Sequence, residues 1–351
     1  GAVSNAFTSQ EYTGYWVKGN PRHLDKFIDI LADIYQESTL PESEIQKEKG
    51  VIIEEINMYE DMTPYKASDV IFEMLYGKHA LARSILGTKE TVASFSREDF
   101  LSYKKRYYNA SNTVVVLAGD VVLSKAMAMI EKGFGELSKS KKNRRSSVSV
   151  LQKAPLTKLF SKTSDQAHFI LAFRSIKFGH KDAAAVRILA TILGRGMSSR
   201  LALIIRDELG AAYYVSAQQN SFVDQGVFFI SAGIDKTRLE EVISRIIIEC
   251  NRLKQEKVEN KELAKAKEFS IGNIRLGLEL SDDVAGFYGT QMVLEQRIRT
   301  PEQVIGEIRK VTARDVMRVA KIIFQAQKAN LAVVGPFKNS DIPKNLLKKL
   351  S

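Results

Sequence analysis

The sequence predicts an α+β fold of two homologous halves, each a mostly antiparallel sheet with helices on one face, and the first half is incomplete. A helix-like run from Arg97 leads into the apolar segment 112–119, and a matching run from Ala313 leads into 329–335. Asp99 and Asp315 occupy equivalent places in these runs, 216 residues apart. Long helical segments alternate with short β-rich ones in both halves, which favours helices layered on a sheet.

The first half opens with β-rich sequence. Residues 3–6 match residues 215–218 of the second half, and 7–17 are rich in threonine and aromatic side chains, which is typical of strands. These residues therefore predict adjacent strands at the front of the first half.

Two helices are expected next. Apolar side chains in residues 21–35 follow the i, i+3, i+4, i+7 spacing of a helix packed on one face, and residues 24–34 of this run match 239–249. Pro41 and the acidic residues after it predict a helix start, and this helix is expected to run to about Tyr59 before Pro64 interrupts it. The side chains expected to point inward are Ile45, Ile52 and Ile56.

The second half shows the same alternation of elements. Residues 167–174 are strand-like, and a helix is expected over 180–193. Ser198 and Ser199 are expected to cap a helix over 200–209. Residues 213–220 and 226–234 have the pattern of a hairpin pair.

The halves differ in one respect. The second half contains a stretch, about 159–214, that has no match in the first. Because residue 1 is Gly and not Met, we expect a front segment of roughly one strand and two helices to be missing. The predicted domains are a first half at 1–137, a basic serine-rich linker at 138–157 and a second half at 158–351.

Composition narrows the function classes. The net charge of +11 comes from basic residues scattered along helices among acidic ones, which argues against nucleic-acid binding. No apolar stretch reaches 18 residues, so no membrane-spanning helix is expected. Cys250 is the only cysteine, which excludes an internal disulfide and fits the reducing conditions of the cytoplasm.

Four motifs follow one another along the chain. They are Asn5-Ala6-Phe7-Thr8-Ser9-Gln10-Glu11-Tyr12-Thr13, Val51-Ile52-Ile53-Glu54-Glu55-Ile56-Asn57-Met58, Met197-Ser198-Ser199-Arg200-Leu201 and Arg206-Asp207-Glu208-Leu209-Gly210-Ala211-Ala212-Tyr213. In this order they resemble the M16 zinc metallopeptidases, the family of pitrilysin, insulin-degrading enzyme and mitochondrial processing peptidase. The short bacterial members look most similar, and the resemblance implies the two-halved M16 (LuxS/metallohydrolase-like) fold over essentially the whole chain.

The resemblance implies a helical His-x-x-Glu-His zinc motif and a distant glutamate as third ligand. In such a site the zinc ion lowers the pKa of bound water and polarises the scissile carbonyl. The motif is absent here, and its place in the family is just upstream of the first strand. The four histidines are expected to be structural: His23, His79, His168 and His180.

Glu55 matches the family's third zinc ligand. Glu48 lies two helical turns earlier on the same face and matches a glutamate that helps to orient the metal site. The alternative is that both belong, with Glu54, to the solvated face of an amphipathic helix. The resemblance implies Zn²⁺ in the full-length protein, and one carboxylate is not expected to hold it tightly.

Arg206 and Tyr213 match a family pair that hydrogen bonds the substrate carbonyl and its developing oxyanion. The alternative is a last-turn arginine and a core tyrosine. Asn5, Ala6 and Phe7 match the edge strand on which the family lays its substrate, and an ordinary interior strand is the alternative.

The expected function is therefore that of a zinc-dependent endopeptidase of peptides or unfolded protein segments, with this chain inactive alone. The alternative is a non-catalytic M16-like subunit that binds peptide or scaffolds a partner. Expected partners are the peptide substrate and either a second copy, as a homodimer, or the missing N-terminal piece, with no nucleic acid and no membrane. Substrate and cleavage preference stay open.

Overall fold

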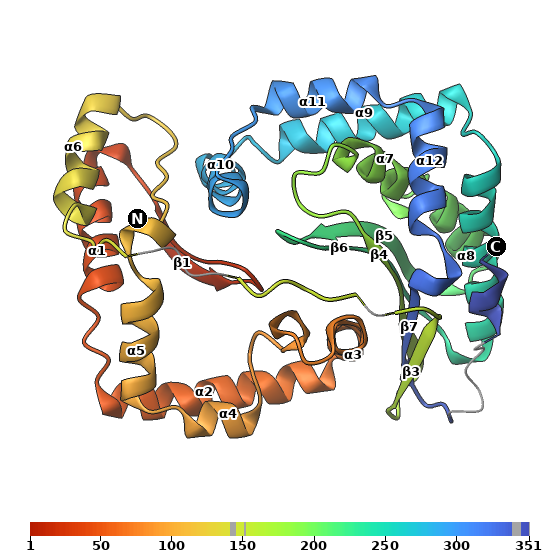
Figure 1. Cartoon of the computed structure of the whole chain (residues 1–351), viewed down its shortest axis with the longest axis horizontal. Coiled ribbons are helices and arrows are strands. Elements are labelled where there is room, and N and C mark those ends of the chain that lie inside the picture. Colours follow the sequence, from red (N-terminus) through yellow and green to blue (C-terminus); the bar gives the residue numbers. More distant parts are fainter. Residues whose placement is uncertain (141–144, 151, 339–344, 351) are drawn as a thin grey trace. The chain divides into compact units, whose positions relative to one another are not determined.

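The computed structural model describes residues 1–140, 145–150, 152–338 and 345–350 (Figure 1). Part of the predicted linker at 138–157 lies outside the described residues. The chain divides into two compact units, which are described one at a time. The first unit comprises Gly1–Asn57, Ser84–Ser146 and Arg275–Arg299, and the second comprises Met58–Arg83, Ser147–Ile274 and Thr300–Ser351.

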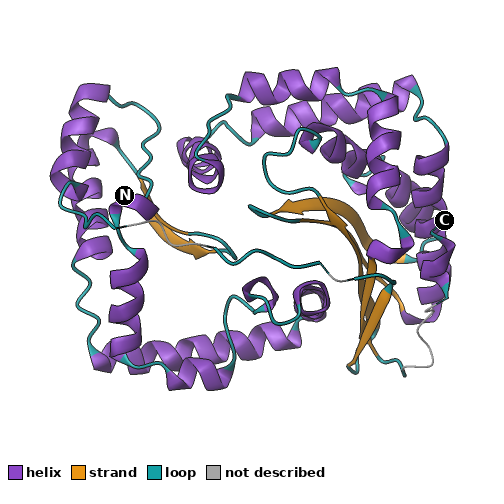
Figure 2. Cartoon of the chain, in the orientation of Figure 1, coloured by secondary structure: helices purple, strands orange, loops and turns teal. Residues whose placement is uncertain are grey.

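A five-stranded sheet forms the centre of the second unit (Figure 2). Its strands, in spatial order, are β3 (Leu156–Ser161), β7 (Ala329–Gly335), β4 (Gln166–Ser175), β6 (Gly226–Asp235) and β5 (Ala212–Ser221). Only the β3–β7 pair is parallel. The mostly antiparallel sheet predicted for this half is therefore confirmed, as is the hairpin of β5 and β6.

Helices cover one face of this sheet. The alternating side chains Phe169, Leu171 and Phe173 of β4 are fully buried in the main core, because period-2 alternation turns them all to the same face. The helices of this core are α7 (Ala183–Gly194), α8 (Leu239–Gln255), α9 (Asn260–Leu276), α11 (Pro301–Lys310) and α12 (Ala313–Ile323).

The other face of the sheet is partly covered by α3 (Thr63–Tyr76), a helix that the sequence analysis did not expect. The helix predicted to run to about Tyr59 ends at Asp61, so the predicted interruption before Pro64 is confirmed. Pro64 itself lies in the first turn of α3, where its missing N–H leaves no hydrogen bond unmade. Ile71 and Phe72 pack with Ile170 and other β-strand side chains in a second core.

The first unit contains a two-stranded antiparallel sheet of β1 (Val3–Thr8) and β2 (Thr13–Lys18). The helices of this unit are α1 (Leu24–Gln36), α2 (Glu42–Asp61), α4 (Lys89–Ser94), α5 (Arg97–Tyr107), α6 (Leu123–Phe134) and α10 (Ser281–Glu295). Gln36 at the end of α1 donates to the carbonyl of Gly133 in α6 at 2.6 Å, and Lys18 pairs with Asp282 of α10 at 2.6 Å. Of the side chains predicted to point inward from α2, Ile45 and Ile56 are buried and Ile52 is half-buried.

The two units do not follow the two halves of the sequence. α3 comes from the first half and lies in the second unit, whereas α10 comes from the second half and lies in the first unit. Each unit thus contains one helix from the other half. The two units are defined by contacts between residues and not by the sequence repeat. The predicted domain boundaries 1–137 and 158–351 therefore stay a prediction.

The duplication is visible in the helix ends. Ser96 accepts a hydrogen bond from the amide of Asp99, whose carboxylate accepts one from the amide of Ser96. Thr312 and Asp315 form the same reciprocal capping box at the start of α12. Capping boxes satisfy amides that a helix start leaves without partners, so the shared motif gives α5 and α12 the same start.

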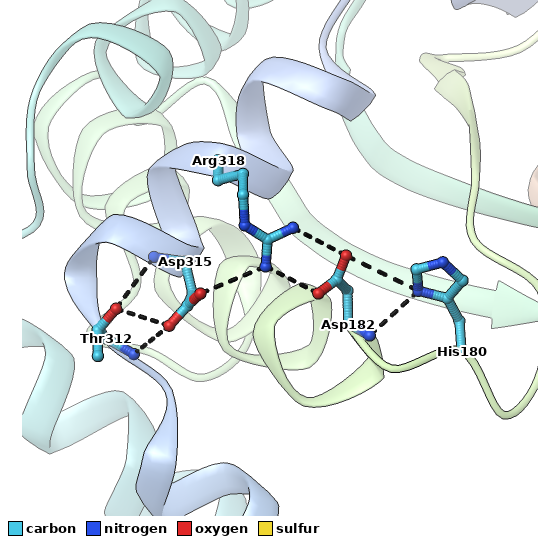
Figure 3. A network of polar contacts seen from close by, with 5 residues as sticks. All are labelled: His180, Asp182, Thr312, Asp315 and Arg318. Atoms are coloured by element: carbon cyan, nitrogen blue, oxygen red, sulfur yellow. Dashed lines mark hydrogen bonds and ion pairs between the residues drawn. The ribbon is translucent and has the colours of Figure 1, made fainter.

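An arginine ties the start of α7 to α12 in the second unit (Figure 3). Two nitrogens of the Arg318 guanidinium donate to the Asp182 carboxylate at 2.9 and 2.8 Å, and one of them also donates to Asp315 at 3.3 Å. His180 accepts from the amide of Asp182 at 3.1 Å. The hydrogen bonds from Arg318 hold the pKa of Asp182 below its usual 3.8.

Arg318→Ala is expected to lower the free energy of unfolding at pH 7 by about 1–2 kcal/mol, because a two-pronged charged contact is lost. Since the pKa of Asp182 is depressed on folding, this stability is present above pH 3.8 and lost as the pH falls through the folded-state pKa. Urea titrations at pH 7 and pH 3 should therefore show a smaller variant effect at pH 3. Arg314→Ala, on the same helix and exposed, should have little effect at either pH.

Candidate functional site

The strand predicted to bind substrate is an edge strand. β1 pairs with β2 alone, with Asn5 opposite Trp16 and Ala6 opposite Tyr15, and its other edge has no partner strand among the described residues. All six residues of β1 are exposed. An unpaired edge offers main-chain donors and acceptors to an extended peptide, so the geometry fits the prediction made for Asn5, Ala6 and Phe7.

Two side chains of β1 already make contacts within the hairpin. The amide of Ala6 donates to Oδ1 of Asn5 at 2.8 Å, so a peptide that paired with this amide would have to displace the Asn5 side chain. Phe7 lies over Gly14, where an added Cβ would be 2.4 Å from its ring, and it meets Tyr12 edge to face at 5.7 Å. Phe7 therefore holds the hairpin together as well as lying on the exposed strand.

The carboxylates predicted near a metal lie on α2, also in the first unit. Glu48 is exposed and Glu55 is half-buried, seven residues further along the helix, while Ile45 and Ile56 are buried. Glu54 is exposed. Glu48 and Glu55 thus share a face of α2 that is accessible to an added group, as their spacing predicts.

Within the part of the chain that the structure describes, no group of three or more His, Cys, Asp or Glu side chains could hold a metal ion. The histidines lie in four separate places and all take part in hydrogen bonds. His23 accepts from Arg22, His79 and His180 accept from amides two residues on, and His168 lies beside Tyr214. The residues present therefore do not make a complete zinc site, and no catalytic step through zinc follows from them.

Arg206 lies in the second unit in a π-helix, Ala202–Glu208, and not in the ordinary α-helix that was predicted. The wide turn shows in the amide of Leu209, which reaches back five residues to the carbonyl of Ile204 at 3.1 Å. Ser199 was predicted to cap this helix, but its hydroxyl donates to the carbonyl of Gly196 at 2.7 Å. Arg206 itself is exposed. Single-turn π-helices occur often at functional sites.

Tyr213 is presented by a β-bulge at the start of β5. Ala212 pairs with Ile234 and Tyr214 with Gly233, so Tyr213 is the extra residue with no partner on β6. Its side chain is 77% exposed. Bulges re-aim side chains, and the exposed phenol of Tyr213 is accessible to a ligand, unlike the core tyrosine that was the alternative.

A histidine that sequence reasoning classed only as structural supports the bulge. Nδ1 of His168 lies 3.2 Å from the hydroxyl of Tyr214, and the two rings stack. Burial lowers the pKa of His168 and raises that of Tyr214. A Cβ on Gly233 would lie 2.6 Å from the Tyr214 ring, so glycine there makes room for the pair. The pair of adjacent tyrosines, Tyr213 and Tyr214, was the one sequence signal for the bulge and its contact with His168.

The motif Met197–Leu201 forms the connection between α7 and the π-helix. Arg200 donates two hydrogen bonds to Glu262, both at 2.8 Å, and one to the buried Glu249 at 3.3 Å. Met197 is 73% exposed, whereas Leu201 is fully buried. The ion pairs fix the loop to α8 and α9, so the motif has a structural role in positioning the π-helix that carries Arg206.

Comparison with known proteins agrees with these features. The family model described as Insulinase (Peptidase family M16) matches residues 1–89, and the one described as Peptidase M16 inactive domain matches residues 94–269. A protein of Bacillus subtilis (strain 168), named as the uncharacterized zinc protease YmxG, is 33% identical over 339 residues, which are 97% of this chain and 82% of that protein.

The chain belongs to the M16 peptidase family. An uncharacterized zinc protease of Rickettsia felis is 30% identical to this M16 chain, with 96% and 81% of the two sequences covered. Among solved structures, a protease from Helicobacter pylori has a TM-score of 0.90 at 24% identity, over 96% of this chain and 82% of that one. That likeness confirms the α+β fold of two homologous halves. No described helix of this M16 chain is both long and apolar enough to cross a membrane.

Proposed function

We propose that this M16 chain forms part of a zinc-dependent endopeptidase that cleaves peptides or unfolded protein segments. The observation that carries the proposal is the presentation of Tyr213, 77% exposed on a bulge, seven residues after the exposed Arg206. A phenol and a guanidinium on the surface are hydrogen-bond donors to a peptide carbonyl. The names of the relatives, which are uncharacterized zinc proteases, support the same class.

Each candidate residue has a distinct role in this proposal. The edge of β1 pairs with the main chain of an extended peptide, which makes binding nearly independent of peptide sequence. Arg206 and Tyr213 donate hydrogen bonds to the peptide. Glu55 serves as a carboxylate ligand to zinc, with Glu48 nearby to orient it, and the other ligands come from outside these 351 residues. The 351-residue chain alone then binds peptide without cleaving it.

A quenched-fluorescence peptide and its uncleavable labelled counterpart test both parts of this function. The chain with added Zn²⁺ should show binding by fluorescence anisotropy and no chelator-sensitive cleavage. A matched peptide with alternate backbone amides N-methylated should bind at least about tenfold more weakly, because methylation removes the donors needed for strand pairing. Chelator-sensitive cleavage by the pure chain, or equal binding of the two peptides, would contradict the proposal.

Tyr213→Phe is expected to weaken peptide binding about three- to tenfold, the effect of one lost hydrogen bond to a carbonyl. Only the hydroxyl is removed from an exposed side chain, so the fold should be unchanged. Tyr103→Phe is the matched control, since Tyr103 is also exposed, at 59%, but lies on α5. Unequal far-UV circular dichroism of the variants, or equal loss in both, would show that the effect is not specific to Tyr213.

The second candidate is a non-catalytic M16 subunit that binds peptide or scaffolds a partner. It is favoured by the wide separation of the four histidines and by the inactive-domain description of the matching second model. A homodimer is the partner proposed for this case. The two candidates differ in the chain upstream of Gly1: a His-x-x-Glu-His sequence there supports the peptidase, and its absence supports the binding subunit.

A further inference from the structure

Tyr214, Gly233 and His168 stand in one row across three strands of the sheet. Tyr214 of β5 pairs with Gly233 of β6, which pairs in turn with His168 of β4. Ile234 and Phe169, the next residues along β6 and β4, belong to the main core. Because side chains alternate along a strand, the row lies on the opposite face of the sheet.

Glycine at position 233 lets the other two side chains of the row meet. A Cβ on Gly233 would lie 2.6 Å from the Tyr214 ring and 3.0 Å from Cε1 of His168. The two rings stack beside this glycine with their centroids 5.9 Å apart, and the Tyr214 hydroxyl lies 3.2 Å from Nδ1 of His168. His168 is only 8% exposed. Tyr214 is therefore held both by its ring and by its hydroxyl group.

The contact is a hydrogen bond between two neutral groups at pH 7. Burial lowers the pKa of His168 and raises that of Tyr214, so neither ring carries a charge. A nearly buried imidazole that loses its partner still bears the cost of desolvation, which exceeds the net gain from one ordinary hydrogen bond. The position of Tyr214 beside His168 is therefore favoured over one in which the two rings separate.

The chain just before Tyr214 is anchored from the main-core face. Ile205 of the π-helix is fully buried, and its carbonyl accepts from the amide of Ala211 at 2.9 Å. The carbonyl of Ala211 accepts from the amide of Asp235 on β6 at 3.3 Å. Ile205 and Ala211 are thus fixed on one face of the sheet, and Tyr214 is fixed on the other.

The two residues proposed to bind peptide lie between these anchors. Arg206 follows Ile205, and Tyr213 precedes Tyr214. Tyr213 is the extra residue of the bulge and is 77% exposed, against 37% for Tyr214. An extra residue makes no cross-strand pair of its own, so its direction depends on how its two neighbours are held. On one side, that hold is the contact of Tyr214 with His168.

We propose that His168 is a positioning residue for peptide binding: by holding Tyr214 beside Gly233, it fixes the bulge that directs Tyr213 towards a peptide carbonyl. His168 does not touch the peptide. The role of Tyr213 rests on the proposed function, whereas the hold of His168 on Tyr214 can be measured without any peptide. The effect of His168 on peptide binding then has an upper limit, which is the effect of the Tyr213 hydroxyl.

The first measurement is the nitration of tyrosines by tetranitromethane in the intact 351-residue chain, mapped by mass spectrometry. Tyr213 should be nitrated readily and Tyr214 slowly, because a hydrogen-bonded phenol with a raised pKa forms little phenolate. His168→Phe keeps an aromatic ring but removes the partner of the Tyr214 hydroxyl, and should speed nitration of Tyr214 at least about fivefold. Ser231→Ala is the matched control on the same two strands. It removes the 2.8 Å hydrogen bond between Ser216 and Ser231 and should leave Tyr214 protected.

The second measurement is the affinity for the labelled uncleavable peptide, by fluorescence anisotropy. His168→Phe and Tyr214→Phe should each weaken binding about two- to fivefold, and the two together no further, because they remove the same hydrogen bond. In a Tyr213→Phe chain neither should weaken binding again, since both act through the Tyr213 hydroxyl. A merely structural role would lower the affinity equally with and without that hydroxyl.

Unchanged nitration of Tyr214 in His168→Phe would overturn the proposal, as would an equal change in Ser231→Ala. A loss of affinity that persists in the Tyr213→Phe chain would overturn it too. If the wild-type chain binds no peptide, the proposed function fails, and the nitration of Tyr214 still decides whether His168 holds this tyrosine. If His168→Phe does not fold, Tyr214→Phe replaces it, and full affinity in that variant would refute the proposal.

Discussion

Phe72→Ala is expected to lower the free energy of unfolding of the second unit by about 3–5 kcal/mol, the cost of emptying an aromatic position in a packed core. Phe72 of α3 is 8% exposed, and its ring lies 6.0 Å from that of Phe222 and 5.9 Å from that of Phe229, on the loop after β5 and on β6. The small residues around it, such as Ala172, cannot fill the space left by a benzyl group.

Hydrogen exchange at the amides of β4 and β6, followed in a urea titration, measures the loss in the free energy of unfolding in these two strands. Glu73→Gln is the matched control, because the neighbouring Glu73 makes a largely exposed ion pair with Lys158 that contributes little. An effect of Phe72→Ala below about 1 kcal/mol would mean that α3 does not pack on this sheet in solution. Such a result would also remove the evidence that a first-half helix completes the second unit.

Gly226→Ala is expected to destabilise the same unit by about 3 kcal/mol or more. Gly226 begins β6, and a Cβ there would lie 1.7 Å from the carbonyl oxygen of Ile176 and 2.7 Å from the Gln219 side chain. The first of these atoms is backbone, which cannot turn away as a side chain can. The turn from β5 into β6 would have to open, and the pairing of Ser175 with Gly226 would be lost.

The control for this glycine is Gly306→Ala, in the interior of α11. A Cβ at Gly306 would meet no atom within 4 Å, and alanine restricts the unfolded chain and favours a helix, so this variant should be more stable by about 0.5–1 kcal/mol. Thermal unfolding of the two variants should therefore shift in opposite directions. Shifts of the same sign would show that the space at Gly226 is larger than the structure indicates.

Local sequence patterns were sufficient for most of the elements. The spacing of Leu24, Phe27, Ile28 and Leu31 predicts α1 because these side chains must share one face, and the hairpin of β5 and β6 follows from two β-rich runs joined by a short turn. Glu55 could be placed on an accessible helix face for the same reason.

The features that were missed depend on contacts distant in sequence. A proline such as Pro64 can interrupt a helix or start one, and only the sheet of the second half gives α3 its buried face. The π-helix around Arg206 and the bulge at Tyr213 each insert one residue into a regular element, which periodicity does not detect. Residues 113–118 have a strand-like sequence, but a strand needs a partner, and local sequence does not say whether one is present.

The position of α3 also has a consequence for synthesis on the ribosome. The helix is translated well before Val334, one of the strand residues against which it packs. At ordinary elongation rates this delay is on the order of 10–50 s. During that time the apolar face of α3 has no sheet to cover it, so the nascent chain is expected to need a chaperone there, at Ile71 and Phe72, until β7 is made.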